Sequence, residues 1–141
     1  MKPVMCMVKD DPENGSYGDC VRACLASMLE LESSEVPHFF ADYSEEDVQR
    51  QNREMQEWFA ERGLTLAFLG LPGGWSQTRF FEYMRKHYKD REYMLWADFG
   101  SGDHAVVCQG GEIVHNPAWY RTGLNCSHSS GYWIAVLIAK L

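Results

Sequence analysis

Apolar residues dominate residues 20–32, where few polar side chains interrupt a run of small and hydrophobic ones. A surface helix would show a single apolar stripe, so this pattern predicts a helix that is packed on most of its sides. Asp19 stands directly before the run and has the side chain of an N-cap residue. We therefore expect a helix that begins at Cys20 and runs through the core.

Two further segments carry apolar residues at helical spacing. Ser44-Glu-Glu-Asp47 has the form of a capping box, and apolar residues follow it at helical spacing until Gly63. This second helix is expected to be amphipathic and peripheral. Ser76 is expected to begin a third helix, because apolar residues follow it along one stripe.

The second half of the chain changes to short runs rich in aromatic and β-branched residues, which are typical of strands. We expect these runs to form an antiparallel sheet, with shorter strands at residues 4–8 and 64–69. The runs are residues 93–99, 104–108, 112–116 and 132–139. Helices followed by strands predict an α+β domain with a helical layer on the sheet. No repeat or linker divides the chain, so residues 1–141 are expected to form a single domain.

Composition excludes several classes of protein. The formal net charge is −7 and no lysine or arginine cluster is present, which argues against a nucleic-acid partner. No apolar run approaches the ~20 residues of a membrane span, and residues 1–9 are too short and weakly charged for a secretory signal. The five cysteines show neither a disulfide framework nor paired zinc spacing. We expect a cytoplasmic protein with reduced thiols and no membrane partner.

Cys20 carries the strongest sign of chemistry. A polar, glycine-containing segment at residues 14–19 precedes it and places its thiol at the start of the predicted apolar helix. The first N–H groups of a helix have no partner within it, and the helix dipole favours negative charge there. A thiol in this position is expected to ionise more easily than a free thiol, as a nucleophile requires.

A histidine and an asparagine stand on the two arms of a predicted hairpin. His104 begins one strand, and Asn116 ends the next. A two-residue turn would bring His115 nearer to His104 than Asn116, because side chains alternate. A three-residue loop from Gln109 to Gly111 would instead place Asn116 directly opposite His104. We favour the three-residue loop, and His115 stays the rival of His104 as a base.

Together these residues supply the parts of a cysteine-histidine enzyme. Cys20 would attack a carbonyl carbon, His104 would take and return the proton, and Asn116 would orient the ring. The backbone N–H of Cys20 would be one donor to the oxyanion. Asn14, six residues before Cys20, would supply a second donor from its amide.

Two other interpretations stay open. Cys20 and Cys24 are four residues apart in the predicted helix. With His104 and His115 they would make up a set of zinc ligands, although structural zinc ligands usually come in tight pairs. The chain could also be a binding or inhibitory protein without turnover, in which Cys20 would have ordinary reactivity.

The chain resembles papain-like cysteine peptidases, most of all the double-glycine leader peptidases of bacteriocin exporters. In that family an Asp-Cys pair opens the central helix, a glutamine lies six residues before the cysteine, a histidine starts a Val-Val strand, and Asp-Pro ends the next strand. The matching positions here are Asn14, Asp19-Cys20, His104 with Ala105-Val-Val107, and Asn116-Pro117. The match covers residues 14–31 and 102–117.

The resemblance implies a papain-like fold, in which a central N-terminal helix packs on a C-terminal antiparallel sheet. It also implies a cysteine peptidase or amidase that acts on a peptide or protein through an acyl thioester, without cofactor or metal. An amine in place of water would make the enzyme an acyl transferase. Three positions depart from the family: Asn14 replaces glutamine, Asn116 replaces aspartate as in papain, and Val21 replaces the glycine after the cysteine.

Overall fold

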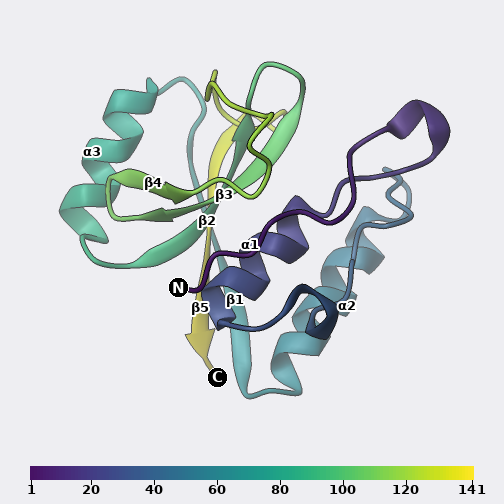
Figure 1. Cartoon of the computed structure of the whole chain (residues 1–141). Helices are drawn as coiled ribbons and strands as arrows, with labels where there is room; N and C mark the ends of the chain where they lie inside the picture. Colours follow the sequence, from purple (N-terminus) through teal and green to yellow (C-terminus); the bar gives the residue numbers. More distant parts are fainter.

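The computed structural model describes all 141 residues and shows an α+β fold, as the sequence predicts. Three α-helices surround a five-stranded antiparallel sheet with the strand order β1-β5-β2-β3-β4 (Figure 1). The helices are α1 (Cys20–Leu29), α2 (Val48–Ala60) and α3 (Gln77–His87). The strands are β1 (Leu64–Pro72), β2 (Glu92–Asp98), β3 (Asp103–Gln109), β4 (Glu112–His115) and β5 (Tyr132–Lys140). Two short 3-10 helices, η1 (Pro12–Asn14) and η2 (Ser33–Glu35), lie in the connections.

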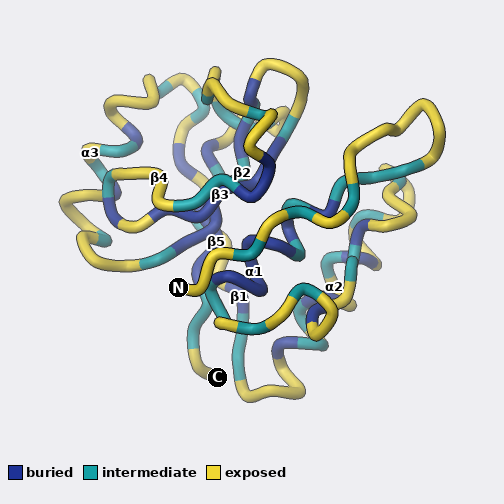
Figure 2. Tube along the Cα trace, viewed as in Figure 1, coloured by how far each residue is buried: buried dark blue, intermediate teal, exposed yellow.

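Both faces of the sheet are buried, each by a different helical layer. Helices α1 and α2 cover one face, where Leu25 and Phe59 belong to the same core cluster as Ala105 of β3. Helix α3 covers the other face, where Phe80 belongs to the cluster of Val106. Figure 1 shows α3 on the opposite side of the sheet from α1 and α2, and Figure 2 shows the deep burial of the strands between them. Strand β3 therefore packs against helices on both faces.

The helix predicted from Cys20 forms, but it is shorter than expected. It ends at Leu29, because Glu30 adopts a left-handed conformation with φ 59° and its N–H bonds back to carbonyl groups of the last turn. The third helix has the predicted N-cap, since Ser76 accepts a hydrogen bond from the N–H of Arg79 at 3.1 Å.

The predicted capping box lies in the turn before α2 and not at the helix itself. Ser44 Oγ accepts the N–H of Asp47 at 3.1 Å, and the helix begins one residue later, at Val48. As expected, α2 is amphipathic, and it buries Met55 and Phe59 on its inner face.

Strand β1 is longer than the sequence predicts. It runs to Pro72 instead of ending at residue 69, because it pairs with β5 along its whole length up to Pro72↔Tyr132. Gly70 and Pro72 look like turn residues in the sequence. Gly70 pairs with Ile134, and Pro72 is the last residue of an edge strand, which is a position where a sheet tolerates proline.

Residues 4–8 do not form the predicted strand. The N–H of Val4 donates to Ser27 Oγ at 2.9 Å, and the N–H groups further along donate to Asp19 and to the carbonyl of Pro117. These partners take the bonds that a neighbouring strand would have made. The segment therefore runs along α1, as the start of the chain does in Figure 1.

The helices have 10, 13 and 11 residues. None of them combines the length and the apolar character that crossing a bilayer requires.

Candidate active site

Cys20 and His104, far apart in the sequence, line one cavity of about 210 Å³ where the start of α1 meets the start of β3. Cys20 is partly exposed, and His104 has no exposed surface. Aromatic side chains form much of the remaining wall. They are Tyr17, Phe39, Phe40, Tyr43, Trp96 and Tyr120.

Asn116 holds the ring of His104, in agreement with the sequence prediction. Its Oδ1 lies 2.8 Å from Nε2 of His104, and the ring packs edge-on against Phe99 with 5.1 Å between the ring centres. The orientation of the Asn116 amide is fixed by two further bonds. Its Nδ2 donates to the carbonyl of Arg121 at 2.7 Å, and its Oδ1 accepts the N–H of Ala118 at 3.0 Å.

This orientation determines the tautomer of His104. Because Oδ1 of Asn116 can only accept, Nε2 must carry the hydrogen, and Nδ1 of the neutral ring keeps its lone pair. Nδ1 is buried and has no hydrogen-bond partner within the chain. Buried polar atoms are normally paired, so an unpaired acceptor in this place is a candidate proton acceptor.

The hairpin between β3 and β4 has a shorter turn than predicted. Gln109 pairs with Glu112, so the turn has two residues and the predicted three-residue loop is wrong. Gly110 has φ 55°, and a Cβ there would lie 2.1 Å from the carbonyl oxygen of Lys89. The tight turn therefore depends on glycine.

A β-bulge restores the alternation that the three-residue loop was expected to supply. The pairing shifts by one residue beyond Cys108↔Ile113, which leaves Val114 as the extra residue. One extra residue reverses the alternation along β4. Asn116 therefore follows β4 on the face of the sheet that carries His104, and their hydrogen bond forms despite the short turn.

His115, the alternative base, makes a hydrogen bond outside the cavity. Nε2 of His115 lies 2.7 Å from the carbonyl oxygen of Val4, and His115 does not line the cavity. Cys24 is fully buried in the core. The alternative zinc site is not assembled, because no three His, Cys, Asp or Glu side chains of the chain come together in a way that could hold a metal ion.

Burial dominates the electrostatics of the cavity. It raises the pKa of the Cys20 thiol, while the N–H groups of Ala105 and Val21 and the charge of Arg121 lower that pKa by less. The helix N-terminus lowers the pKa of Cys20 as expected, through the N–H of Val21, but burial outweighs this effect, so the expectation that the thiol ionises more easily than a free one is wrong. Burial also lowers the pKa of His104 to about 4. At neutral pH the site holds a neutral thiol and a neutral imidazole.

The structure does not bring Asn14 to the cavity. Asn14 is exposed at the end of η1, and its Nδ2 donates to Asp11 Oδ2 at 2.8 Å. The loop closes on itself through backbone bonds between Asp11 and Ser16 in both directions. This local closure keeps the amide away from Cys20, so the second oxyanion donor expected from the sequence is missing.

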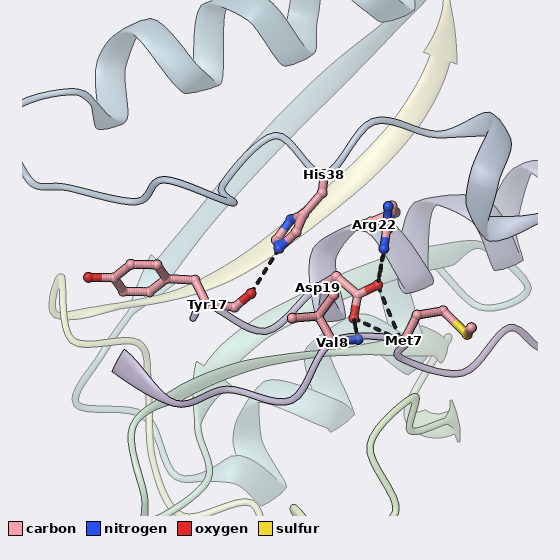
Figure 3. A network of polar contacts seen from close by, with 6 residues as sticks. All are labelled: Met7, Val8, Tyr17, Asp19, Arg22 and His38. Carbon is pink, nitrogen blue, oxygen red and sulfur yellow. Dashed lines mark hydrogen bonds and ion pairs between the residues drawn. The ribbon is translucent and has the colours of Figure 1, made fainter. Parts of the chain in front are cut away.

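Asp19 is a site residue whose role the sequence did not reveal (Figure 3). Its fully buried carboxylate makes no capping bond to α1. It accepts the N–H groups of Met7 and Val8 at 3.0 and 2.9 Å, and it pairs with Arg22 at 2.6 Å. The residue before Cys20 is therefore fixed from two sides. An arginine three residues after the aspartate was the available sequence signal.

Two histidine contacts also escaped prediction. Nε2 of His38 lies 2.8 Å from the carbonyl oxygen of Tyr17, which ties the approach to Cys20 to the loop after η2 (Figure 3). His128 lines the cavity with its Nε2 3.2 Å from Asp103 Oδ2. Both partners are distant in the sequence, so neither contact leaves a local pattern.

Comparison of the chain with protein-family models, with curated proteins and with solved structures gave no match.

Proposed function

We propose that this protein is a cysteine hydrolase that cleaves an amide bond of a peptide or protein. One observation carries the proposal. His104 shares a cavity with the Cys20 thiol, and the bond from Nε2 to Asn116 leaves Nδ1 as a buried, unpaired base. This set of groups supports a papain-like triad, as the sequence resemblance implies.

In the proposed reaction the proton of the Cys20 thiol passes to Nδ1 of His104 while Sγ attacks the carbonyl carbon. His104 then gives the proton to the leaving amine nitrogen, and an acyl thioester remains on Cys20. Water, activated by the same Nδ1, attacks the thioester and releases a carboxylic acid and the thiol. Attack by an amine in place of water would transfer the acyl group.

The state at rest is neutral, which distinguishes this site from a preformed thiolate-imidazolium pair. Burial raises the pKa of Cys20 and lowers that of His104, so proton transfer accompanies the attack. The N–H of Cys20 donates no hydrogen bond within the chain, which leaves it free as an oxyanion donor. All five cysteines are free, which suits a cytoplasmic location.

A second candidate is a papain-like binding module without turnover. The position of Asn14 favours it, because the cavity lacks the side-chain oxyanion donor expected from the sequence. Such a donor is worth about 10²–10³ in rate where it has been removed from enzymes.

A peptide that ends in an electrophilic epoxide tests the proposal. We expect a mass adduct on Cys20 and slower labelling by about a hundredfold in His104→Gln, because a general base contributes about 10²–10⁴ in rate. His87→Gln, at an exposed position on α3, is the matched control and should label like the wild type. Peptide mapping by mass spectrometry locates the adduct.

Equal labelling of Cys20 in the wild type and in His104→Gln would show that the histidine does not activate the thiol. Labelling that depends on His104, but without hydrolysis of any peptide in a degenerate library, would favour the binding module.

A further inference from the structure

An apolar groove adjoins the cavity of Cys20. It has a volume of about 320 Å³ and is formed by residues 5–9 of the N-terminal segment and residues 117–120 after Asn116. Four residues line both the groove and the cavity, so the two hollows are direct neighbours: Cys6, Val8, Ala118 and Tyr120.

The groove exposes large hydrophobic side chains. Trp119 is 77% exposed and Met7 is 74% exposed, and Met5 and Tyr120 are also open to solvent. Single exposed hydrophobic residues are common, but four that gather at one hollow mark a binding surface. The only charged side chain in the groove wall is that of Lys9.

The backbone of the groove wall has free hydrogen-bonding groups. The carbonyl groups of residues 5–8 accept no hydrogen bond within the chain, and the N–H groups of Met5 and Lys9 donate none. Free backbone groups beside apolar side chains match an extended polypeptide, whose main chain pairs with the wall while its side chains fill the hollow. A lipid chain would leave these groups unpaired.

The wall is also held in place before any ligand binds. The N–H of Cys6 donates to the carbonyl of Pro117 at 2.9 Å, which joins the two sides of the groove. The next two N–H groups, those of Met7 and Val8, donate to the buried carboxylate of Asp19. A rigid site loses less conformational entropy on binding than a mobile one.

We propose that this groove binds an extended polypeptide segment, with an aromatic or large aliphatic side chain beside Trp119, on one side of the bond presented to Cys20. The identity of the segment as substrate rests on the proposed function. Binding itself does not, because the groove lies outside the thiol and imidazole. Trp119 is then a specificity-determining residue.

The test uses Cys20→Ala protein, which cannot turn over. Immobilised protein is incubated with a random octapeptide pool, and the retained peptides are sequenced by mass spectrometry. We expect enrichment of Trp, Phe, Leu or Met at one position, and affinities about tenfold weaker or more when Trp119→Ala is added. Tyr132→Ala, an aromatic residue that is 55% exposed and does not line the groove, is the control and should leave binding unchanged.

Equal retention by the Trp119→Ala protein, or no retention by Cys20→Ala alone, overturns the inference. A blue shift of tryptophan fluorescence with phosphatidylcholine vesicles but not with peptides also overturns it. Failure of the proposed function looks different, because Cys20→Ala would still retain apolar peptides that the wild type does not hydrolyse.

Discussion

At the scale of single residues, the proposed chemistry depends on the side chain of Asn116. Its amide accepts from His104 and Ala118 and donates to Arg121, so it cannot rotate without losing these bonds. The fixed amide sets the tautomer of His104 and leaves Nδ1 free. Asn116 is thus a positioning residue that acts through the imidazole.

Replacing Asn116 by aspartate tests this role. A carboxylate at Nε2 would stabilise the imidazolium, so Asn116→Asp should raise the pKa of His104 from about 4. Titration of the ring by NMR measures the shift, and Asn125→Asp, at an exposed position, is the control. An unchanged pKa of His104 would contradict the hydrogen bond.

His104 should also make stability depend on pH. Its pKa of about 4 in the folded state lies below the ordinary value of 6.5, so the unfolded chain binds more protons between these values. The contribution of the neutral ring is fully present above about pH 6.5 and decreases as the pH falls towards about 4. We expect a loss of about 2 kcal/mol between about pH 7 and pH 5 from this group.

Urea unfolding of the wild type and of His104→Gln at both pH values measures this loss. The variant should lose less stability on acidification than the wild type. An equal loss in both proteins would show that His104 is not held neutral in the folded state.

At the scale of elements, the hairpin shows how one extra residue decides which side chain meets His104. The two-residue turn alone would have turned His115 towards the face of His104. The bulge at Val114 reverses that alternation and brings Asn116 there instead. Strand β4 therefore contributes to the site through its register with β3, and not through its own side chains.

One alanine inserted between Val114 and His115 moves the residues after it on by one position and should place His115 where Asn116 lies now. We expect the epoxide labelling of Cys20 to fall to the level of His104→Gln, since the imidazole loses its acceptor. Val114→Ala keeps the length of β4 and should label normally. Normal labelling after the insertion would show that this register of Asn116 is not needed.

The N-terminal segment depends on Asp19 in a similar way. Asp19→Asn removes the charge that pairs with Arg22 and weakens the acceptor of two backbone N–H groups. Because the carboxylate is fully buried, we expect a loss of about 2–4 kcal/mol in the free energy of unfolding. Asp11→Asn, at an exposed position, should cost little, and chemical denaturation compares the two. A loss no larger than that of Asp11→Asn would remove Asp19 from this role.

At the scale of the whole molecule, the cavity exists because two layers meet at the edge of the sheet. Helix α1 packs against β3 and β2, and its first residue reaches the start of β3. Strand β4 is short and leaves that part of β3 uncovered, so loops from several parts of the chain close the wall. The groove beside it arises in the same way, from two segments more than a hundred residues apart.

The sequence by itself determined the local elements and the two principal site residues. Periodicity predicted α1 from Cys20 and the strands of the second half, and periodicity with the Ser76 cap predicted α3, because these signals are set by neighbouring side chains. The approach to Cys20 and the strand beginning at His104 identified the residues that line the cavity.

Only the tertiary structure decided the features that depend on distant partners. The N-terminal segment is not a strand because its N–H groups donate to the side chains of Asp19 and Ser27. Asn14 does not reach the cavity because its amide donates to Asp11 within its own loop. The pKa of Cys20 is raised because desolvation depends on all the atoms packed around the thiol, which a local helix-terminus argument does not count. Strand pairing, burial and the bulge are properties of the assembled sheet, so they cannot be predicted from a short segment of the sequence.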